Sequence, residues 1–508
     1  MNKSMVQYIA ATVAGTLAGI IVVASPIGVQ AGLPALTVLS GLRIAAMRTK
    51  NVSCVAGVCT PTKAKAVLNV SDLAKMLAVS DVTLRTSSTA APDIQFATPM
   101  SWTSGFQLNL DSFRSVQIIA PLSDTGTGGL AITTNDGGTG GALSFVAGGS
   151  LTFPGLDNRL SINGNAYTLV SDIVTLANDM AANPAGNYAL AMNYDAEGDG
   201  AYPAAPVATV VQGTFEGLGN AIGNLTILDT SNVGDSRDAL FGEIGATGAV
   251  RDMILANVNV SYSGTPQTND VVAAALVAEN GGVVVNSSAA GRVSVTTGTV
   301  GGLVGRNANQ NASVSSSHAN VGVAAGPSSF AGGLAGLNSA GAISLSYATG
   351  SVSGSGDGDE VGGLLGVNSS GGLVSESYAT GAATMAQGDV GDVGGLIGAL
   401  TTSAKFLRSY AVGAVSPANN CKADSPCAGG LVGEDLAKGG KQSYWDLISS
   451  GIGDPSQGSG NVSNDKGIVG LSTSQFLSTL PKGFSKKIWA ETPGVNNGYP
   501  YMIENPPQ

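Results

Sequence analysis

The chain has 508 residues, of which 43% are apolar, 11% charged and 5% aromatic, and its net charge is −11. This apolar fraction excludes disorder by composition. The negative charge, without a cluster of Lys or Arg, argues against a nucleic-acid partner. The 73 glycines, with abundant Ser, Thr, Val, Ala and Asn, are typical of short strands joined by tight turns.

Residues 1–31 have the pattern of a secretory signal peptide. Lys3 supplies a short positive region, Tyr8 to Val23 is nearly all apolar or small, and Val29-Gln30-Ala31 fits a small-residue cleavage site. We therefore expect cleavage after Ala31 and a mature chain without a membrane span, with an uncleaved membrane anchor as the alternative. The protein is expected outside the cell or on its surface, with the periplasm as the alternative.

The four cysteines also favour export. Cys54 pairs in sequence with Cys59, and Cys421 with Cys427. An even, locally paired set in an exported chain predicts two disulfides. A zinc site made from all four is disfavoured, because the spacings are wider than C-x2-C and His318 is the only histidine.

The first part of the mature chain predicts a lead-in followed by many short strands. Residues 32–61 are left as a lead-in without assigned structure, and Ser71–Leu77 predicts a short capping helix with Ser71 as its N-cap. Seven short apolar segments lie between Asp81 and Leu169, separated by turn residues. They are Val82–Leu84, Ile94–Phe96, Phe106–Leu110, Val116–Ile119, Leu130–Ile132, Leu143–Phe145 and Leu151–Phe153.

A β-sandwich has similar strand spacing, but the adjoining repeats favour a coil of parallel strands. Residues 62–185 are accordingly expected to form a β-helix with its capping helix. A second helix is predicted over Ser171–Ala181, ending before Pro184.

Five copies of one short pattern fill the second half of the chain and start 31, 30, 32 and 35 residues apart. They are Gly301–Gly305, Gly332–Gly336, Gly362–Gly366, Gly394–Gly398 and Gly429–Gly433, all of the form GGLxG. A period of this length indicates a solenoid, in which each unit buries its apolar face against its neighbours. We predict an all-β, right-handed parallel β-helix over 186–436, each coil having about 30 residues in three strands, with GGLxG as the first strand.

Stacked coils place like residues in ladders. The leucines of the repeat should form a buried ladder, and its last glycines a turn ladder with positive φ or close backbone approach. The tyrosines should pack beside the coil, with a sugar-stacking platform as the alternative. The leucines are Leu303, Leu334, Leu364, Leu396 and Leu431; the glycines are Gly305, Gly336, Gly366, Gly398 and Gly433; the tyrosines are Tyr347, Tyr378 and Tyr410.

The repeat resembles the GLUG repeat of bacterial surface proteins. Ser346–Gly350 and Ser377–Gly381 both read S-Y-A-T-G, Ser409–Gly413 differs by one residue, and His318 stands where a tyrosine is expected. Upstream, Thr214–Asn220 is similar to a segment of filamentous-haemagglutinin-type adhesins. The tail also matches these adhesins, at Ser443–Asp446, at Trp489 and at Gly498–Pro500.

This resemblance covers about 62–505 and implies a bacterial surface adhesin, while specifying activity only weakly. The chain has no convincing two-partner-secretion domain, no autotransporter barrel and no sortase anchor. A separate secretion partner is therefore left open.

Catalytic and metal chemistry find little support in the sequence. With one histidine and no H-E-x-x-H, His-dependent triads and His-rich zinc sites are excluded. The acidic runs Asp195–Gly200 and Asp357–Glu360 lack Ca²⁺-loop spacing and are interpreted as solvated loops, with Ca²⁺ kept as an alternative. No other cofactor is expected.

Residues 437–508 are expected to form a C-terminal cap. Trp445, beside Asp446, should cover the end of the apolar stack, with sugar binding as the alternative. A short helix over Ser472–Leu480, with Trp489 and Tyr499, should shield the open strand edge.

The sequence thus predicts a non-catalytic adhesin that binds host-cell or matrix glycans or proteins along an elongated face. Irregular loops at Asn307–Ser315, Ser351–Glu360 and Pro417–Pro426 are the expected contacts. The alternatives are a carbohydrate-active β-helix enzyme, either a lyase or a hydrolase, and a structural matrix component.

Overall fold

The computed structural model describes residues 40–507 except 147, 233, 266–269, 387–389, 402 and 417–427. The expected signal peptide with Ala31, the Cys421/Cys427 pair and the loop Pro417–Pro426 therefore lie outside the described residues.

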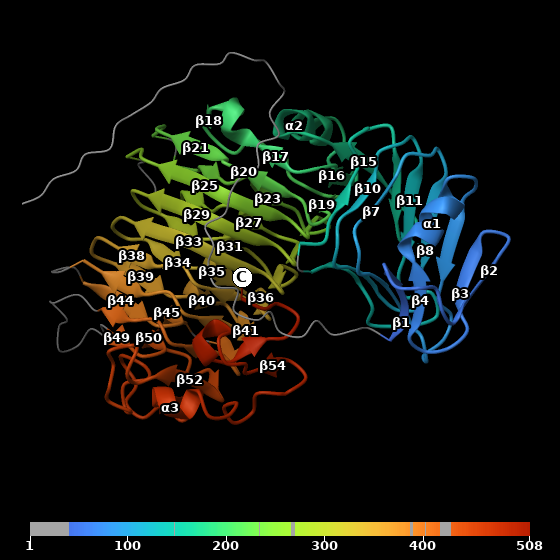
Figure 1. Cartoon of the computed structure of the whole chain (residues 1–508). Helices are drawn as coiled ribbons and strands as arrows, with labels where there is room; N and C mark the ends of the chain where they lie inside the picture. Colours follow the sequence, from blue (N-terminus) through green and yellow to red (C-terminus); the bar gives the residue numbers. More distant parts are fainter. Residues whose placement is uncertain are drawn as a thin grey trace, which may run out of the picture.

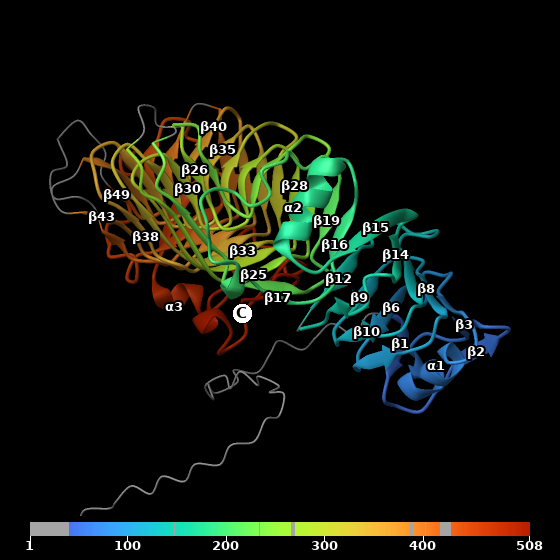
Figure 2. The ribbon, with the colours of Figure 1, turned by 90° about the horizontal axis from the view of Figure 1, so that it is seen from above.

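The chain forms a parallel β-helix, as the repeats predict (Figure 1). Six sheets run across successive coils, and a two-stranded ribbon lies near the C-terminus. Seen from above, an N-terminal lobe, which contains the strands up to residue 162, lies beside a repeat lobe, which contains the strands from residue 188 onward (Figure 2).

Two small sheets belong to the N-terminal lobe alone. The first contains β1 (Gly41–Ala45), β4 (Ala66–Asn69), β6 (Asp93–Phe96), β9 (Val116–Ile118) and β12 (Leu143–Phe145); the second contains β7 (Met100–Trp102), β10 (Leu122–Asp124) and β13 (Leu151–Thr152).

A sixteen-stranded sheet, called the shared sheet, runs through both lobes. Its strands are β2 (Val52–Val55), β3 (Val58–Pro61), β5 (Val82–Arg85), β8 (Gln107–Asp111), β11 (Gly129–Thr133), β14 (Arg159–Ile162), β15 (Asn165–Val170), β16 (Tyr188–Leu190), β19 (Thr214–Glu216), β24 (Ala249–Arg251), β28 (Val283–Val285), β32 (Ser313–Ser315), β36 (Ala342–Ser344), β41 (Leu373–Ser375), β46 (Lys405–Leu407) and β51 (Gly440–Lys441).

A fifteen-stranded sheet of the repeat lobe is called the groove sheet. Its strands are β17 (Tyr194–Asp195), β18 (Ala201–Tyr202), β20 (Ala221–Gly223), β21 (Thr226–Asp229), β25 (Ile254–Tyr262), β29 (Ser288–Val295), β33 (His318–Ala325), β37 (Tyr347–Ala348), β38 (Val352–Gly354), β42 (Tyr378–Ala379), β43 (Ala383–Met385), β47 (Tyr410–Ala411), β48 (Val415–Ser416), β52 (Ser443–Asp446) and β53 (Ile468–Leu471).

Two seven-stranded sheets flank the GGL corner of each repeat. The pre-corner sheet contains β22 (Arg237–Asp238), β26 (Val272–Ala273), β30 (Thr299–Gly301), β34 (Phe330–Gly332), β39 (Asp359–Gly362), β44 (Gly391–Gly394) and β49 (Ala428–Gly429). The post-corner sheet contains β23 (Phe241–Ile244), β27 (Val277–Asn280), β31 (Val304–Asn307), β35 (Ala335–Ser339), β40 (Leu365–Ser369), β45 (Ile397–Leu400) and β50 (Val432–Asp435). The C-terminal ribbon pairs β54 (Trp489–Ala490) with β55 (Tyr501–Met502).

Each full coil therefore has four sides, where three strands were predicted. The GGLxG segment is a corner between two strands, not one strand, because Gly302 and Leu303 lie between β30 and β31. The five repeat leucines are fully buried, and each of the first four donates its backbone N–H to the leucine carbonyl of the next coil at 2.8–2.9 Å. The leucine ladder is thus a core feature.

The last glycine of each repeat lies within a post-corner strand, so the predicted turn ladder with positive φ is wrong there. The alternative reason for a glycine at this position, the close approach of neighbouring backbones, is confirmed. A Cβ on Gly336 would lie 2.7 Å from Thr299 Cγ2 and 2.8 Å from Val300 N, and one on Gly366 would lie 2.6 Å from Gly336 O. The two corner sheets pack too closely for any side chain at this position.

A second, serine ladder explains the S of the S-Y-A-T-G segment. Ser317 and Ser346 each donate the backbone N–H to the serine hydroxyl of the next coil, Ser346 and Ser377, at 3.2 and 3.3 Å. The residue before each serine is left-handed, with φ of 48° at Ser316 and 52° at Leu345. These hydrogen bonds hold the turn from the shared sheet to the groove sheet in the same shape in every coil.

A third ladder is made of buried asparagines between the post-corner and shared sheets. Asn280, Asn307, Asn338 and Asn368 are fully buried, and each of the first three donates its Nδ2 to the next Oδ1 at 2.8 Å. Such stacking satisfies polar groups that burial would otherwise destabilise. Leu400 takes the next position in register.

The two lobes have separate cores on opposite faces of β15 and β16. Val170 and Leu190 belong to the repeat-lobe core, whereas the intervening Leu169 and Ala189 belong to the N-terminal core. This two-sided burial follows an antiparallel hairpin between β14 and β15, which reverses the direction of the strands at the junction.

Three short helices lie close to the predicted positions. α1 (Val70–Leu77) has Asn69 as its N-cap, not Ser71, because Asn69 Oδ1 accepts the Ser71 N–H at 2.8 Å. α2 (Ile173–Ala182) begins after the N-cap Asp172. α3 (Thr473–Phe476) is shorter than predicted, although Ser472 and Gln475 form a capping box. The lead-in also differs, since β1 pairs with both β4 and β6.

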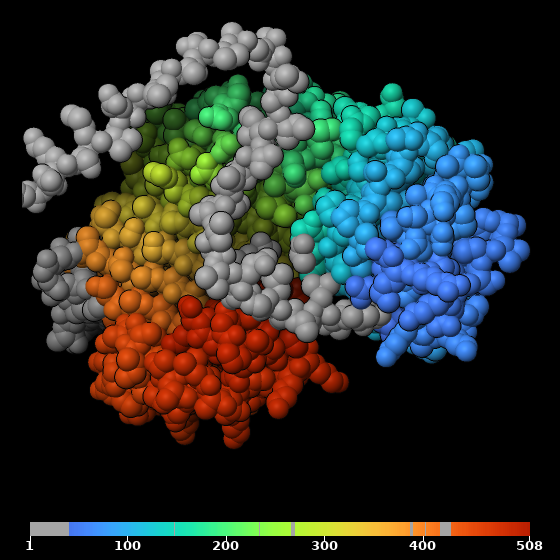
Figure 3. Space-filling model, in the orientation of Figure 1, coloured from blue at the N-terminus to red at the C-terminus, as the bar shows by residue number. Residues whose placement is uncertain are grey.

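The C-terminal residues cover the β-helix at its end and along its side. Trp445 is fully buried, and its indole lies so near that a Cβ on Gly430 would approach within 2.2 Å. The C-terminal segment, red in Figures 1 and 3, lies against the last coils. It then runs back along the side of the coils, where Asn505 donates Nδ2 to Leu345 O at 3.0 Å. Trp489 is thus buried against the side of the β-helix, whereas it was expected at the open end.

Candidate binding groove

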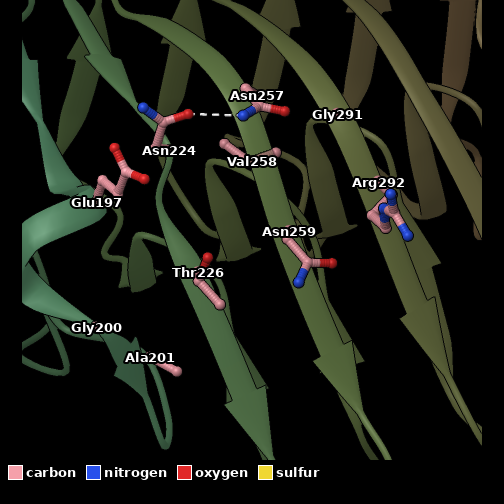
Figure 4. A pocket seen from close by; sticks show the side chains of 10 residues that line it. All are labelled: Glu197, Gly200, Ala201, Asn224, Thr226, Asn257, Val258, Asn259, Gly291 and Arg292. Carbon is pink, nitrogen blue, oxygen red and sulfur yellow. Dashed lines mark hydrogen bonds between the residues drawn. The ribbon is translucent and has the colours of Figure 1, made fainter.

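A polar groove of about 670 Å³ opens on the outer face of the groove sheet (Figure 4). Its lining comes from four successive levels of the coil. These residues are Glu197, Gly200, Ala201, Asn224, Thr226, Asn257, Val258, Asn259, Gly291 and Arg292.

Register places the lining side chains in one column. Ala201 pairs with Thr226, Thr226 with Asn259, and Asn259 with Arg292. Neighbouring strands are about 4.8 Å apart, so the column crosses the coils along the solenoid axis. Glu197 joins it from the 3₁₀ turn η1 (Ala196–Asp199).

A β-bulge shapes the floor of the groove. The register between β25 and β29 shifts between Leu255 and Val258, where Asn257 has φ of 55°. Opposite it, Gly291 has φ of 143°, and a Cβ there would lie 2.1 Å from Val258 O. Bulges of this kind redirect side chains at functional surfaces.

An amide chain fixes one wall. Asn257 donates Nδ2 to Asn224 Oδ1 at 2.6 Å (Figure 4). Asn224 in turn donates Nδ2 to Asp195 Oδ1 at 2.8 Å. The hydrogen bond from Asn224, with that from the Glu197 N–H, lowers the pKa of Asp195. Asp195 is therefore a charged anchor for this wall.

The remaining polar side chains are free to meet a ligand. Among the residues described, the side chains of Glu197, Thr226, Asn259 and Arg292 take part in no intramolecular hydrogen bond or ion pair. By contrast, Asp199 accepts hydroxyl hydrogen bonds from Tyr194 at 2.5 Å and Tyr202 at 2.6 Å.

The acidic run Asp195–Gly200 thus divides by role. Asp195 and Asp199 hold the wall and the 3₁₀ turn, whereas Glu197 projects into the groove as its one lining carboxylate. Burial, followed by the hydrogen bond to Asp199, raises the pKa of both Tyr194 and Tyr202. These tyrosines remain protonated donors.

The tyrosine ladder is present but covered. His318, Tyr347, Tyr378 and Tyr410 stack with ring centroids 4.7, 4.8 and 5.0 Å apart and planes within 7° of parallel. The three tyrosines are at most 2% exposed. Trp489 packs on Tyr378 and Tyr410, so a sugar has no access to these rings in this structure.

His318 is also held by the returning tail. Its Nδ1 lies 3.1 Å from Asn505 Oδ1, and burial lowers its pKa to about 4. A neutral histidine in an aromatic stack has a packing role, as a tyrosine has in the other coils.

The second acidic run, Asp357–Glu360, is a solvated loop only in its first half, because Asp357 and Gly358 form an exposed turn and the next two residues belong to β39. Asp359 is fully buried in β39 and accepts the Ser329 N–H at 2.9 Å. Glu360 lies beside Asp392 of the next coil. Burial and then the charge of Asp392 raise the pKa of Glu360 to about 9.

The two predicted contact loops that the structure describes are also partly strand. Asn307 belongs to the buried amide ladder, and Ser313–Ser315 form β32. Within Ser351–Glu360, half of the residues belong to β38 and β39. Each predicted loop therefore keeps a short turn between strands, at 308–312 and at 355–358.

Trp445 and Asp446 form no sugar site. Trp445 donates its indole N–H to Ile452 O at 3.2 Å, and Asp446 is fully buried and accepts the Tyr499 hydroxyl at 2.9 Å. The end-capping role predicted for Trp445 agrees with this burial.

Of the two predicted disulfides, Cys54–Cys59 lies in the described part of the chain and is formed across the β2–β3 hairpin. Over the described ranges, no helix is long and apolar enough to cross a membrane. Within the same ranges, no three His, Cys, Asp or Glu side chains gather in a metal-binding arrangement.

Sequence reasoning did not find the groove itself. Its lining comes from several coils, and the bulge that forms its floor leaves no repeat signature. The sequence does contain one usable feature: Asn224, Asn257 and Gly291 occupy matching places in successive units.

No protein-family model matches this chain, and a search of curated proteins finds no match. Among solved structures, the chain is similar to a Bacteroides ovatus protein described as "a putative immunoglobulin A1 protease". The TM-score is 0.42 and the identity 17%, over 67% of this chain and 93% of that chain. A similarity at this level carries no argument about activity, so the GLUG and haemagglutinin-type resemblance stays a prediction.

Proposed function

We propose that this chain is an exported, non-catalytic, adhesin-type protein that binds a glycan or glycoprotein of a host cell or matrix in the polar groove. The observation that carries this proposal is the column of unpartnered side chains from four coil levels, namely Glu197, Thr226, Asn259 and Arg292.

These side chains suit a ligand rich in hydroxyl groups. A sugar hydroxyl both donates and accepts, and the groove offers the carboxylate of Glu197 as acceptor and the guanidinium of Arg292 as donor. Thr226 and Asn259 between them can do both. The open column favours an extended chain lying across several coils.

A carbohydrate-active enzyme is less well supported. Glycoside hydrolysis needs two carboxyl groups facing one bond, and the groove lining contains a single carboxylate, Glu197. A structural matrix component is also less well supported, because Trp445 is fully buried at the end of the apolar stack, where strands of another copy would pair.

Export is supported by the Cys54–Cys59 disulfide, which persists in oxidising compartments. The signal-like residues 1–31 and the resemblance to bacterial surface proteins agree with it. Whether a secretion partner takes part stays a prediction of the sequence.

The test is glycan-array binding by the mature chain, beside a double variant Asn259→Ala/Arg292→Ala. We expect saturable binding that the double variant loses by at least about tenfold, since each lost hydrogen bond to a charged group contributes roughly 1.5–3 kcal/mol. Lys405→Ala, which removes a cation from an exposed strand position on another sheet, is the matched control. Equal binding by the double variant and this control would contradict the proposal.

Location is tested separately by protease digestion of intact cells beside a lysed sample. Digestion of the protein on intact cells supports the adhesin. Protection until lysis places it in the periplasm and favours a soluble carbohydrate-handling role.

A further inference from the structure

Two aspartates occupy core positions in an early coil of the repeat lobe, the one that contains β21 and β22. Asp229 ends β21 in register with Tyr262, and the next coils place Val295 and Ala325 there. Asp238 ends β22 in register with Ala273, followed by Val300 and Ala331. Later coils fill both columns with apolar side chains.

Both carboxylates are buried together. Asp229 is 3% exposed and Asp238 is 0% exposed. Ser236 lies between them, its Oγ 2.7 Å from Asp229 Oδ2 and 3.0 Å from Asp238 Oδ2. A hydroxyl has one hydrogen, so it satisfies one of the two carboxylate oxygens at a time.

The remaining oxygens are unevenly satisfied. Asp229 Oδ1 accepts the Ser231 N–H at 2.7 Å. Asp238 Oδ1 is buried with no hydrogen-bond partner in the described structure. A fully buried, unpaired carboxylate oxygen is strongly destabilising unless something else neutralises it.

The adjacent cation does not neutralise the pair. Arg237 points away, with its guanidinium 2.6 Å from Asp235 and 2.9 Å from Glu279, and it also donates to Asp270 O at 3.0 Å. The pair therefore needs either a shared proton or a bound cation.

We propose that Asp229, Asp238 and the hydroxyl of Ser236 form a site for Ca²⁺. Ca²⁺ takes six to eight oxygen ligands in flexible geometry, from carboxylates, hydroxyls, backbone carbonyls and water. Two carboxylates balance its charge, and its binding explains why acids stand in two apolar columns. This site is distinct from the acidic runs Asp195–Gly200 and Asp357–Glu360, and it is independent of the glycan proposal.

The test is thermal unfolding of the full mature chain after metal removal with EDTA, followed by CaCl₂ at roughly millimolar concentration, where extracellular modules bind. We expect CaCl₂ to raise Tm by several degrees in the wild type and not in Asp238→Asn. In EDTA the variant should melt no lower than the wild type, because it lacks the like-charge repulsion. Asp157→Asn, an exposed position with the same charge change, should respond to CaCl₂ as the wild type does.

Calorimetric titration of the metal-free protein with CaCl₂ is the second readout, and we expect one site that Asp238→Asn removes. An equal Tm rise in Asp238→Asn, or no rise in the wild type, overturns the proposal in favour of a shared proton. An equal response to MgCl₂ overturns the assignment to Ca²⁺, since Mg²⁺ demands near-octahedral geometry.

Discussion

Trp489 donates its indole N–H to Glu376 Oε2 at 2.5 Å, although 113 residues separate the two in sequence. Glu376 is a left-handed turn residue of the β-helix, and its other oxygen pairs with Arg408 of the next coil. This contact fixes the tail against the tyrosine ladder, which makes the tail part of the folded core.

Trp489→Ala should release the tail. It removes a ring stacked on Phe484 at 4.5 Å and leaves Glu376 without one partner, so we expect a loss of about 3–5 kcal/mol. Limited proteolysis after residue 472 measures release of the tail, and denaturant unfolding measures the loss of stability. Trp489→Phe, which keeps a ring but no N–H, should lose less; an unchanged digestion pattern in Trp489→Ala would refute the anchoring role.

Asn338→Ala should break the amide ladder. Asn307 Nδ2 loses its acceptor, the Oδ1 of Asn338, and Asn368 Oδ1 loses its donor, the Nδ2 of Asn338. Leaving buried groups unpaired costs about 1–3 kcal/mol each, so we expect a loss of at least about 2 kcal/mol in urea unfolding. Ser339→Ala, one residue away and partly exposed, should change little.

Stability should fall as pH rises, because of the acidic stack. Burial raises the pKa of Glu360 to about 9 and of Asp392 to about 7, with Glu434 and Asp359 adding negative charge nearby. A carboxyl with a raised folded pKa binds more protons in the folded state, so its stabilising effect is complete below about pH 4 and is lost as pH rises toward 9.

Glu360→Gln removes the ionisation. We expect it to melt above the wild type at about pH 8 and close to it at about pH 4, because the wild-type carboxyl is neutral in both states only at low pH. Asp157→Asn is the control for loss of one charge. Parallel pH profiles for wild type and Glu360→Gln would show that this carboxyl does not drive the slope.

Gly291→Ala should destroy the bulge under the groove. Its Cβ would lie 2.1 Å from Val258 O at φ of 143°, whereas a Cβ on Gly322, the register partner of Arg292, would have its nearest contact at 3.9 Å. We expect Gly291→Ala to lose about 2 kcal/mol and the glycan binding, and Gly322→Ala to keep both. Equal effects of the two variants would mean that the bulge does not shape the site.

The second predicted disulfide is tested by peptide mapping. Trypsin cuts after Lys422, between Cys421 and Cys427, so a disulfide keeps the two peptides joined until reduction. We expect one joined pair in the unreduced protein. Two separate alkylated peptides from an unreduced sample would show that the pair is not bonded.

Local patterns predicted most of the fold. The apolar segments from Val82 to Phe153 are strands, because alternation of apolar and polar residues directly reflects a half-buried strand. The leucine ladder followed from the repeat for the same reason. The GGL corner was mistaken for a strand, since its glycines serve close sheet packing, which depends on the neighbouring coil and not on local conformation.

The sequence by itself determined that this chain is a solenoid of coils of about 30 residues, because a repeated apolar pattern can be buried only by stacking on its copies. It also determined the export-type disulfide Cys54–Cys59. Only the tertiary structure decided which polar residues meet. Asn259 and Arg292 share a groove because strand register aligns residues about one coil apart. Asp229 and Asp238 meet at the Ser236 hydroxyl because the coil turns from the groove sheet to the pre-corner sheet between them. No local pattern relates the members of either set.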